Sequence, residues 1–176
     1  ATDSTALGNN ATVAAGHINS TAIGTGATTN NANQMMFGTG TTTYQAPGIT
    51  STDSVSRQSG PLQLITTDAQ GHLASDGGAV FTALAKAQAG IAIALAIEAP
   101  SLARSSESFG LRVGYGHFNG VANALGASAI GVMCRSCLSP GDRISLDAAV
   151  GAGWSDFKSY SSDNVFAGRV GMQWTW

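Results

Sequence analysis

Charge is scarce in this sequence. Asp, Glu, Lys and Arg together make up 10% of the 176 residues, whereas a soluble domain carries roughly 25%. Only two lysines occur, Lys86 and Lys158, and the 23 glycines outnumber all the charged residues. A chain of this composition is poorly equipped to face water as a compact monomer.

The sequence also lacks a strong net charge and a long apolar run. A formal charge of −2 with 43% hydrophobic residues argues against a disordered chain and offers no basic surface for nucleic acid. The best apolar stretch, AGIAIALAI at 89–97, is shorter than the roughly 20 residues of a membrane-spanning helix. If the chain spans a membrane, it must therefore do so as a closed β-barrel. The start of the sequence has no basic and apolar leader, which is typical of a mature or excised product.

Four segments have the alternation of β-strands. They cover 108–118, about 122–134, 143–154 and the terminal NVFAGRVGMQWTW at 164–176. Each is long enough for the roughly 9 to 11 residues with which a tilted strand crosses a bilayer. The second segment consists of small residues, and its alternation is ambiguous.

The other three segments have one bulky apolar face and one face of glycine with isolated charges. A soluble sandwich would place Lys, Glu and Thr on the second face, so we expect the apolar faces to contact lipid. The expected lipid-facing residues are Phe109, Leu111, Val113, Tyr115, Ile144, Leu146, Val150, Trp154, Phe166, Val170, Met172, Trp174 and Trp176. The expected pore-facing residues are Gly110, Arg112, Gly114, Gly116, Arg143, Asp147, Gly151, Gly153, Arg169 and Gly171. Tyr115, Trp154, Trp174 and Trp176 are expected near the two membrane interfaces as an aromatic belt.

Residues 77–100 are predicted to form a helix, with Asp76 as N-cap and Pro100 as stop. A heptad-like row contains Phe81, Leu84, Gln88, Ile91 and Leu95. The helix is rich in alanine and apolar almost all round, so it must be enclosed. The glycine faces of the strands would accommodate such a thin helix.

The number of strands requires several copies of the chain. Four strands cannot close a barrel with room for a helix, since eight already give an interior just filled by side chains. An open sheet in lipid would leave its edges unpaired. Two chains would supply eight strands, too few for two helices, so three chains with twelve strands are the smallest solution.

Residues 1–49 contain a degenerate repeat with marker glycines Gly8, Gly24 and Gly38, spaced 16 and 14 apart. Such short repeats cannot each close a core, so we expect them to stack as a β-roll or β-solenoid. The small apolar pair before each glycine would be buried against the next coil: Ala6 and Leu7, Ala22 and Ile23, Met36 and Phe37. A low-complexity linker is the alternative. Residues 50–76 are interpreted as a connector with a hairpin around the turn Asp68-Ala-Gln-Gly71.

Cys134 and Cys137 form a C-x-x-C pair in the turn between the second and third strands. Such pairs occur in redox sites, in zinc sites and as local disulfides. Zinc would need two more ligands, and a redox pair usually opens a helix beside a sheet. In an oxidising envelope we therefore expect a structural disulfide, on the periplasmic side if the helix runs inward.

Other polar side chains give no indication of catalysis. His17, His72 and His117 share no ligand-like spacing, and no Ser, His and Asp grouping stands in a recognisable motif. We therefore expect no enzymatic activity, metal or cofactor. The charges on the inward faces need partners or hydration in the pore mouth. We expect Asp147 to pair with Arg169 or Arg112, and Glu98 to take another arginine.

STALG, STAIG and AQAGIAIALAI followed by four strands and a terminal aromatic resemble the trimeric autotransporter adhesins of Gram-negative bacteria, the Yersinia adhesin A-like family. The resemblance covers nearly the whole chain and is weakest over 50–76, although GPLQLITTDAQGHLASD resembles a connector seen in some members. It implies a left-handed parallel β-roll head (1–49), a connector (50–76), a pore-filling helix (77–100) and membrane-anchor strands (101–176). The family's long stalk is missing, so a minimal member or the end of a longer one is expected.

The resemblance also implies a function. The anchor would bring the passenger out across the outer membrane, and the terminal aromatic would be recognised by the outer-membrane barrel assembly machinery. The head would be displayed on the cell surface for adhesion or as a structural element, with a ligand that the sequence does not identify. Two alternatives stay open: a monomeric porin-like transport protein, which should have eight or more strands, and a secreted trimeric fibre-like β-structure.

Overall fold

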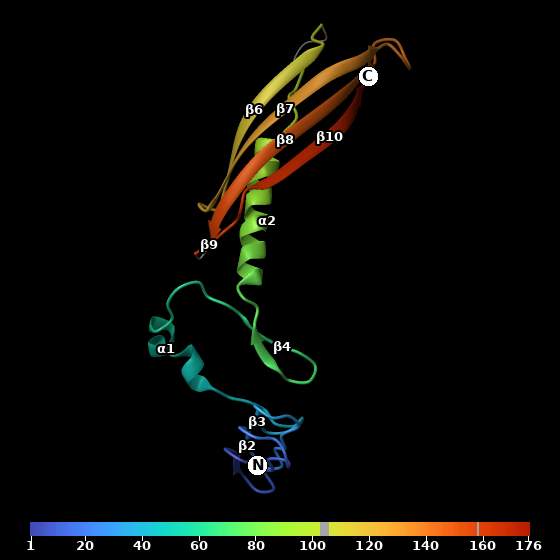
Figure 1. The fold of residues 1–176 in the computed structure, drawn as a ribbon. Coiled ribbons are helices and arrows are strands. Elements are labelled where there is room, and N and C mark those ends of the chain that lie inside the picture. The colour runs from blue at the N-terminus through green and yellow to red at the C-terminus, as the bar shows by residue number, and fades with distance from the viewer. Residues whose placement is uncertain (103–105, 158) are drawn as a thin grey trace. The chain divides into compact units, whose positions relative to one another are not determined.

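The computed structural model describes residues 1–102, 106–157 and 159–176. The chain is mostly β with one long helix, as the sequence predicts (Figure 1). It divides into two compact units, residues 1–57 and 58–176.

Three short parallel strands form the first unit: β1 (Thr5–Leu7), β2 (Thr21–Ile23) and β3 (Met35–Phe37). Their order is β1-β2-β3, and the repeats are in register, so that Ala22 lies between Ala6 and Met36. A further parallel bridge joins Thr12 to Thr28. The repeats therefore stack on one another, as the spacing of the marker glycines predicts.

Small side chains fill the interior of this unit. Ala22 is fully buried, and Ser20 and Thr29 are almost fully buried. The expectation that both residues of each apolar pair are buried is wrong. Strand alternation turns the second residue of the pair outward, so Leu7 is 64% and Phe37 47% exposed. Ala6 is exposed as well, because β1 is at the end of the stack.

The marker glycines allow the repeats to stack closely. Gly8 and Gly24 have φ values of +134° and +114°, which side chains rarely adopt. A Cβ on Gly8 would lie 2.7 Å from the carbonyl carbon of Gly24, and one on Gly24 would lie 3.2 Å from the Cα of Gly38. Glycine is therefore required where one coil crosses the next.

Two short helical turns follow that the sequence did not predict, the 3-10 helix η1 (Pro47–Thr50) and α1 (Thr52–Ser56). Ser51 caps α1, because its Oγ accepts a hydrogen bond from the Ser54 N–H at 3.1 Å. Neither turn buries a residue. No apolar periodicity therefore marks them in the sequence.

The second unit contains the predicted hairpin, with β4 (Ile65–Thr67) antiparallel to β5 (Leu73–Ser75). Asp68 Oδ1 accepts the N–H groups of Gln70 and His72 at 2.9 and 3.0 Å, and Oδ2 lies 2.6 Å from His72 Nδ1. The contact with the His72 side chain is the largest cause that lowers the pKa of Asp68. The aspartate thus fixes the turn.

Helix α2 (Ala79–Ala96) is shorter than predicted. The N-cap is Gly78 rather than Asp76, because Gly77 and Gly78 have left-handed backbone with φ of 62° and 83°. The Asp76 carboxylate still accepts the N–H groups of Gly78 and Val80 at 2.9 and 3.1 Å. By length and composition α2 could cross a membrane. The core helix of a soluble protein meets the same test.

Four long antiparallel strands follow α2: β6 (Phe109–Phe118), β7 (Ala122–Arg135), β8 (Arg143–Phe157) and β10 (Val165–Thr175). They match the four predicted segments, and their order is β10-β8-β7-β6. The short β9 (Tyr160–Ser161) pairs with the end of β8. Neighbours in sequence are thus neighbours in the sheet.

The core of this unit lies between α2 and one face of the sheet (Figure 1). Helix α2 contacts all four long strands. The buried cluster comprises Ala92, Ile93 and Ala96 of α2, the C-cap residue Ile97, and Ala122, Ala124 and Ala149 of the sheet. Because five of these seven residues are alanines, the helix backbone comes close to the strands.

Candidate functional site

The outer face of the sheet, which points away from α2, is apolar and exposed. The register aligns Leu111, Ala129, Ala148 and Val170 in one row across the four strands, so the face is continuous. All the predicted lipid-facing residues except the half-buried Ile144 are exposed, from 41% at Trp154 to 90% at Trp176. In water such a surface would be costly, because monomeric soluble proteins rarely expose large contiguous apolar patches.

The register also defines the faces of β7, which were ambiguous in the sequence. Leu125 pairs with Tyr115 of β6 and with Ala152 of β8, so Leu125 lies on the outer face. The pairing with β8 shifts between Val132 and Cys134. A β-bulge there interrupts the alternation only near the end of the strand. In the sequence the alternation was ambiguous because small residues occur on both faces of β7.

The inner face, toward α2, carries glycine where the helix comes closest. A Cβ on Gly116 would lie 1.9 Å from the carbonyl oxygen of Ala92, and one on Gly114 would lie 2.2 Å from that of Ala96. Real Cβ atoms essentially never come within 3.0 Å of another heavy atom. These glycines are therefore required for the observed position of α2.

Four other predicted pore-facing glycines also lie on the inner face. A Cβ on Gly151 or Gly153 would be 2.7 or 2.8 Å from the Ile93 side chain of α2. Gly110 instead faces Ile130 of β7, and Gly171 leaves space for the Asp147 carboxylate. The glycines of this face thus accommodate side chains as well as the helix.

The charged groups of the inner face form two of the pairs that the sequence predicts. Arg169 Nη2 donates a hydrogen bond to Asp147 Oδ2 at 2.7 Å between β10 and β8. Arg112 of β6 pairs with Glu98, just beyond the end of α2. Arg143 lies farther along β8, opposite Thr175. The Asp147 side chain is only 7% exposed, so its partner compensates for the loss of hydration.

Two neutral hydrogen bonds, which the sequence did not predict, fix α2 along the strands. Ser155 Oγ donates to Gln88 Oε1 at 3.3 Å, and Ser128 Oγ donates to the backbone carbonyl of Glu98 at 2.8 Å. Gln88 and Ser155 are both buried. Sliding the helix would leave these groups without partners, at a cost of about 1–3 kcal/mol each.

The structure divides the predicted heptad row of α2 between two faces. Gln88 faces the sheet, and Phe81 stacks on Tyr160 with ring centroids 5.5 Å apart. Leu84, Ile91 and Leu95 are 41%, 42% and 54% exposed. The helix therefore has a second apolar face that nothing in the described chain covers.

Aromatic residues lie at both ends of the sheet. Trp154 pairs with Asn123 near the β6–β7 turn, whereas Trp174 pairs with Ile144 near the β7–β8 turn. Tyr160 lies over Gly78, where a Cβ would be 2.3 Å from the tyrosine ring, and its hydroxyl donates to the Leu62 carbonyl at 2.5 Å. The start of α2 is thus at the β6–β7 end of the sheet.

The β7–β8 turn is organised by Asp142 and by a disulfide between Cys134 and Cys137. The Asp142 carboxylate accepts the N–H groups of Cys137, Leu138 and Ser139 at 2.8, 3.0 and 3.2 Å. It is 2% exposed. The role of this aspartate was not predicted from the sequence, although a Pro-Gly-Asp turn is a usable signal.

Acid is expected to loosen this turn. Burial favours the neutral form of Asp142, but the three N–H groups and the Trp174 side chain outweigh it and lower the pKa. With a folded pKa below the unfolded value, the stabilisation is complete above about pH 4 and is lost as the pH falls through the folded pKa. An NMR titration of the Trp174 indole N–H should show a midpoint below the pKa of an ordinary aspartate, and none in Asp142→Asn. A midpoint at or above the ordinary value would show that the turn does not stabilise the carboxylate.

The disulfide determines how many thiol-alkylating labels the protein can take up, which its mass reports. Unreduced protein treated with a thiol-alkylating reagent should take up no label, and reduction before alkylation should add two labels, because the chain contains two cysteines. Cys134→Ser with Cys137→Ser is the matched control and should take up none in either state. Two labels on the unreduced protein would show that both thiols are free.

The histidines lie apart. His17 Nδ1 is 2.9 Å from Thr29 Oγ1 in the first unit, His72 contacts Asp68, and His117 Nδ1 is 3.0 Å from Asn123 Oδ1. Among residues 1–102, 106–157 and 159–176, no group of three His, Cys, Asp or Glu side chains could hold a metal ion.

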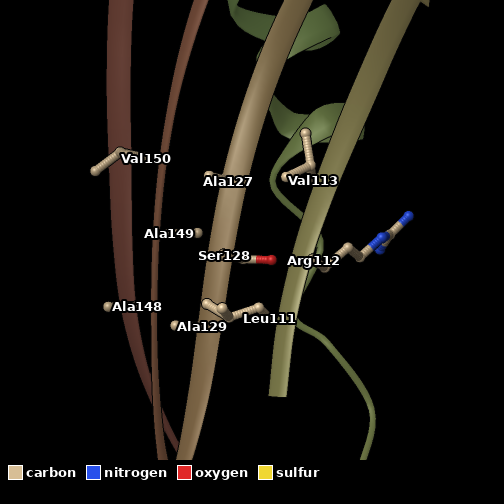
Figure 2. Close-up of a pocket in the computed structure, with 9 residues that line it drawn as sticks. All are labelled: Leu111, Arg112, Val113, Ala127, Ser128, Ala129, Ala148, Ala149 and Val150. Atoms are coloured by element: carbon tan, nitrogen blue, oxygen red, sulfur yellow. The ribbon is translucent and has the colours of Figure 1, made fainter.

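A shallow groove of about 310 Å³ crosses the sheet. Its outer-face residues are Leu111, Val113, Ala127, Ala129, Ala148 and Val150, and we call them the alanine groove. Figure 2 shows Val150 pointing to one side of the sheet and Ser128 and Arg112 to the other, where α2 lies. The groove forms because small alanines lie between bulkier side chains of β6 and β8.

Comparison of the chain with models of protein families, with curated proteins and with solved structures found no match.

Proposed function

We propose that three copies of this chain form a twelve-stranded barrel in the outer membrane of a Gram-negative bacterium, which exports and displays the N-terminal repeats. The observation that carries the proposal is the contrast between the two faces of one sheet. The outer face is apolar and exposed along all four long strands. The inner face is covered by α2, which can lie this close only because the strands carry glycine there.

The sheet edges support assembly from several copies. Strands β6 and β10 are the ends of the path β10-β8-β7-β6, and unpaired edges are not tolerated in lipid. With an even number of antiparallel strands per chain, β10 of one copy and β6 of the next also run antiparallel. Copies can therefore join without a break in the hydrogen-bonding pattern.

The helix supports three copies rather than two. Leu84, Ile91 and Leu95 recur at the spacing of a coiled-coil seam and are exposed in the single chain. Three helices in contact along this seam would bury it in the barrel centre. Eight strands would leave no room for two helices, because eight already enclose an interior filled by side chains.

The first unit supports a role as the displayed head. Its stacked parallel repeats fit a left-handed β-roll, the head of the adhesin family that the sequence resembles. We propose adhesion or surface structure as its role, with the anchor as translocation unit and Trp176 as part of the signal for the barrel assembly machinery. No cofactor or enzymatic activity is part of this proposal.

The experiment is a denaturing gel of the detergent-extracted chain with and without boiling. We expect a band near three times 17.7 kDa in the unheated sample and a single-chain band after boiling. Leu84→Asp with Leu95→Asp should abolish the upper band, whereas Leu64→Asp, in the exposed segment before β4, serves as control. A chain that is monomeric in buffer without detergent would overturn the proposal.

A further inference from the structure

One end of the outer face carries polar side chains. A surface that contacts only hydrocarbon would not need them. Tyr115 donates its hydroxyl to Asn123 Oδ1 at 2.5 Å, and the same oxygen lies 3.0 Å from His117 Nδ1. The Tyr115 and His117 rings are stacked, with centroids 6.4 Å apart. Trp154 is paired with Asn123 across β7 and β8. We call these four residues the aromatic–amide cluster.

The alanine groove begins beside this cluster. The first row across the strands contains His117, Asn123 and Trp154, and the second contains Tyr115. The third row, which belongs to the groove, contains Val113, Ala127 and Val150. The far end of the groove at Leu111 is six residues from His117, or about 20 Å. With a strand tilt of about 45° this is about 14 Å along the membrane normal, roughly half of the ~30 Å hydrocarbon core. Cluster and groove thus span about one hydrocarbon leaflet.

The chemistry of the two parts differs. The groove offers only apolar side chains outward, which suits an acyl chain. The cluster contains aromatic rings, an amide and a phenol but no Lys or Arg, and Asp156 follows Trp154 by two residues on the same face of β8. Rings with nearby hydroxyl and amide groups suit a sugar, which presents both apolar faces and hydroxyls. A phosphate would favour cationic partners.

We propose that this surface binds a glycolipid, with an acyl chain in the alanine groove and a sugar ring on the aromatic–amide cluster. The inference rests on the proposed function, because the outer face must lie in a membrane. The cluster is at the β6–β7 end of the sheet, where α2 begins under Tyr160. In the proposed barrel this end faces the cell exterior, so the ligand comes from the outer leaflet.

The test uses the full chain as the detergent-extracted oligomer, with its gel mobility checked on the same sample. Binding of lipopolysaccharide without O-antigen, dephosphorylated so that it offers sugars and acyl chains only, is measured by native mass spectrometry and by Trp fluorescence, beside phosphatidylglycerol and free glucosamine. We expect saturable binding of the lipopolysaccharide and weaker binding of the other two. Asn123→Ala should weaken it about fivefold, as expected for one lost hydrogen bond. Ala127→Leu, which fills the groove, should weaken it similarly.

Val170→Leu is the matched control, because it adds bulk to the same face outside the groove, and it should leave the affinity unchanged. Equal binding of phosphatidylglycerol, or lipopolysaccharide binding that neither Asn123→Ala nor Ala127→Leu changes, would overturn the glycolipid site. Free glucosamine binding as tightly as the lipopolysaccharide would overturn the role of the groove. In these cases a trimer band that disappears on boiling would still support the proposed barrel. Failure of the glycolipid site can therefore be distinguished from failure of the proposed function.

Discussion

Gly116→Ala is expected to displace α2 from the sheet and to destabilise the assembled protein by about 3 kcal/mol. The new methyl group would lie 1.9 Å from the Ala92 carbonyl oxygen. Both sides of this contact are backbone, so no side-chain rotation relieves it. The measurement is the temperature at which the oligomer band disappears on an unboiled gel, with tryptophan fluorescence as a second readout.

Gly131→Ala is the matched control for this substitution. Gly131 is in β7, and a Cβ there would have no heavy atom within 4 Å. Loss of glycine flexibility in the unfolded chain should leave the stability unchanged or raise it by less than about 1 kcal/mol. If Gly116→Ala and Gly131→Ala melt alike, α2 does not lie against β6 as described.

Asp147→Leu is expected to lower the heat resistance of the oligomer because it leaves Arg169 without its carboxylate partner, 2.7 Å away in the native chain. Breaking a fully buried pair costs about 3–5 kcal/mol. The Arg169 side chain is 42% exposed and regains some hydration, so we expect about 2 kcal/mol. The oligomer band should therefore disappear at a lower temperature.

The double variant Asp147→Leu with Arg169→Met tests the cause. Replacing both charges by apolar groups removes the unpaired guanidinium, so most of the lost heat resistance should return. Asp147→Asn keeps an oxygen acceptor for Arg169 and should be milder than Asp147→Leu. An oligomer band of Asp147→Leu that melts with the wild type would argue against a stabilising role for the pair.

Much of the second unit could be predicted because its pattern is local. Alternation along the strands indicated the two faces of β6, β8 and β10, whereas β7 has small residues on both faces and its alternation was ambiguous. The pairing of Asp147 with Arg169 followed from adjacent strands and a charge that needs a partner. Predicting such a pair requires only the order of the strands in the sheet. Strands joined by short turns are usually neighbours, so this order follows from the sequence.

Other features depended on contacts between distant residues. Nothing near Gly78 in the sequence indicates that Tyr160 lies over it, and Phe81 left the predicted heptad row because Tyr160 and Phe157 provide a partner. In the first unit, burial of the apolar pairs was overestimated because a strand of three residues can turn only alternate side chains inward.

The contact of Tyr160 with the segment before α2 has a mechanical consequence. Its hydroxyl holds the Leu62 carbonyl, and its ring rests on Gly78, so tension applied upstream of Leu62 reaches the β8–β10 connection before it reaches the helix. In the proposed trimer, a force that pulls on the three heads would therefore act first at the end of the barrel, on the Tyr160 contact of each chain. The three α2 helices would bear this force only after the Tyr160 contacts break.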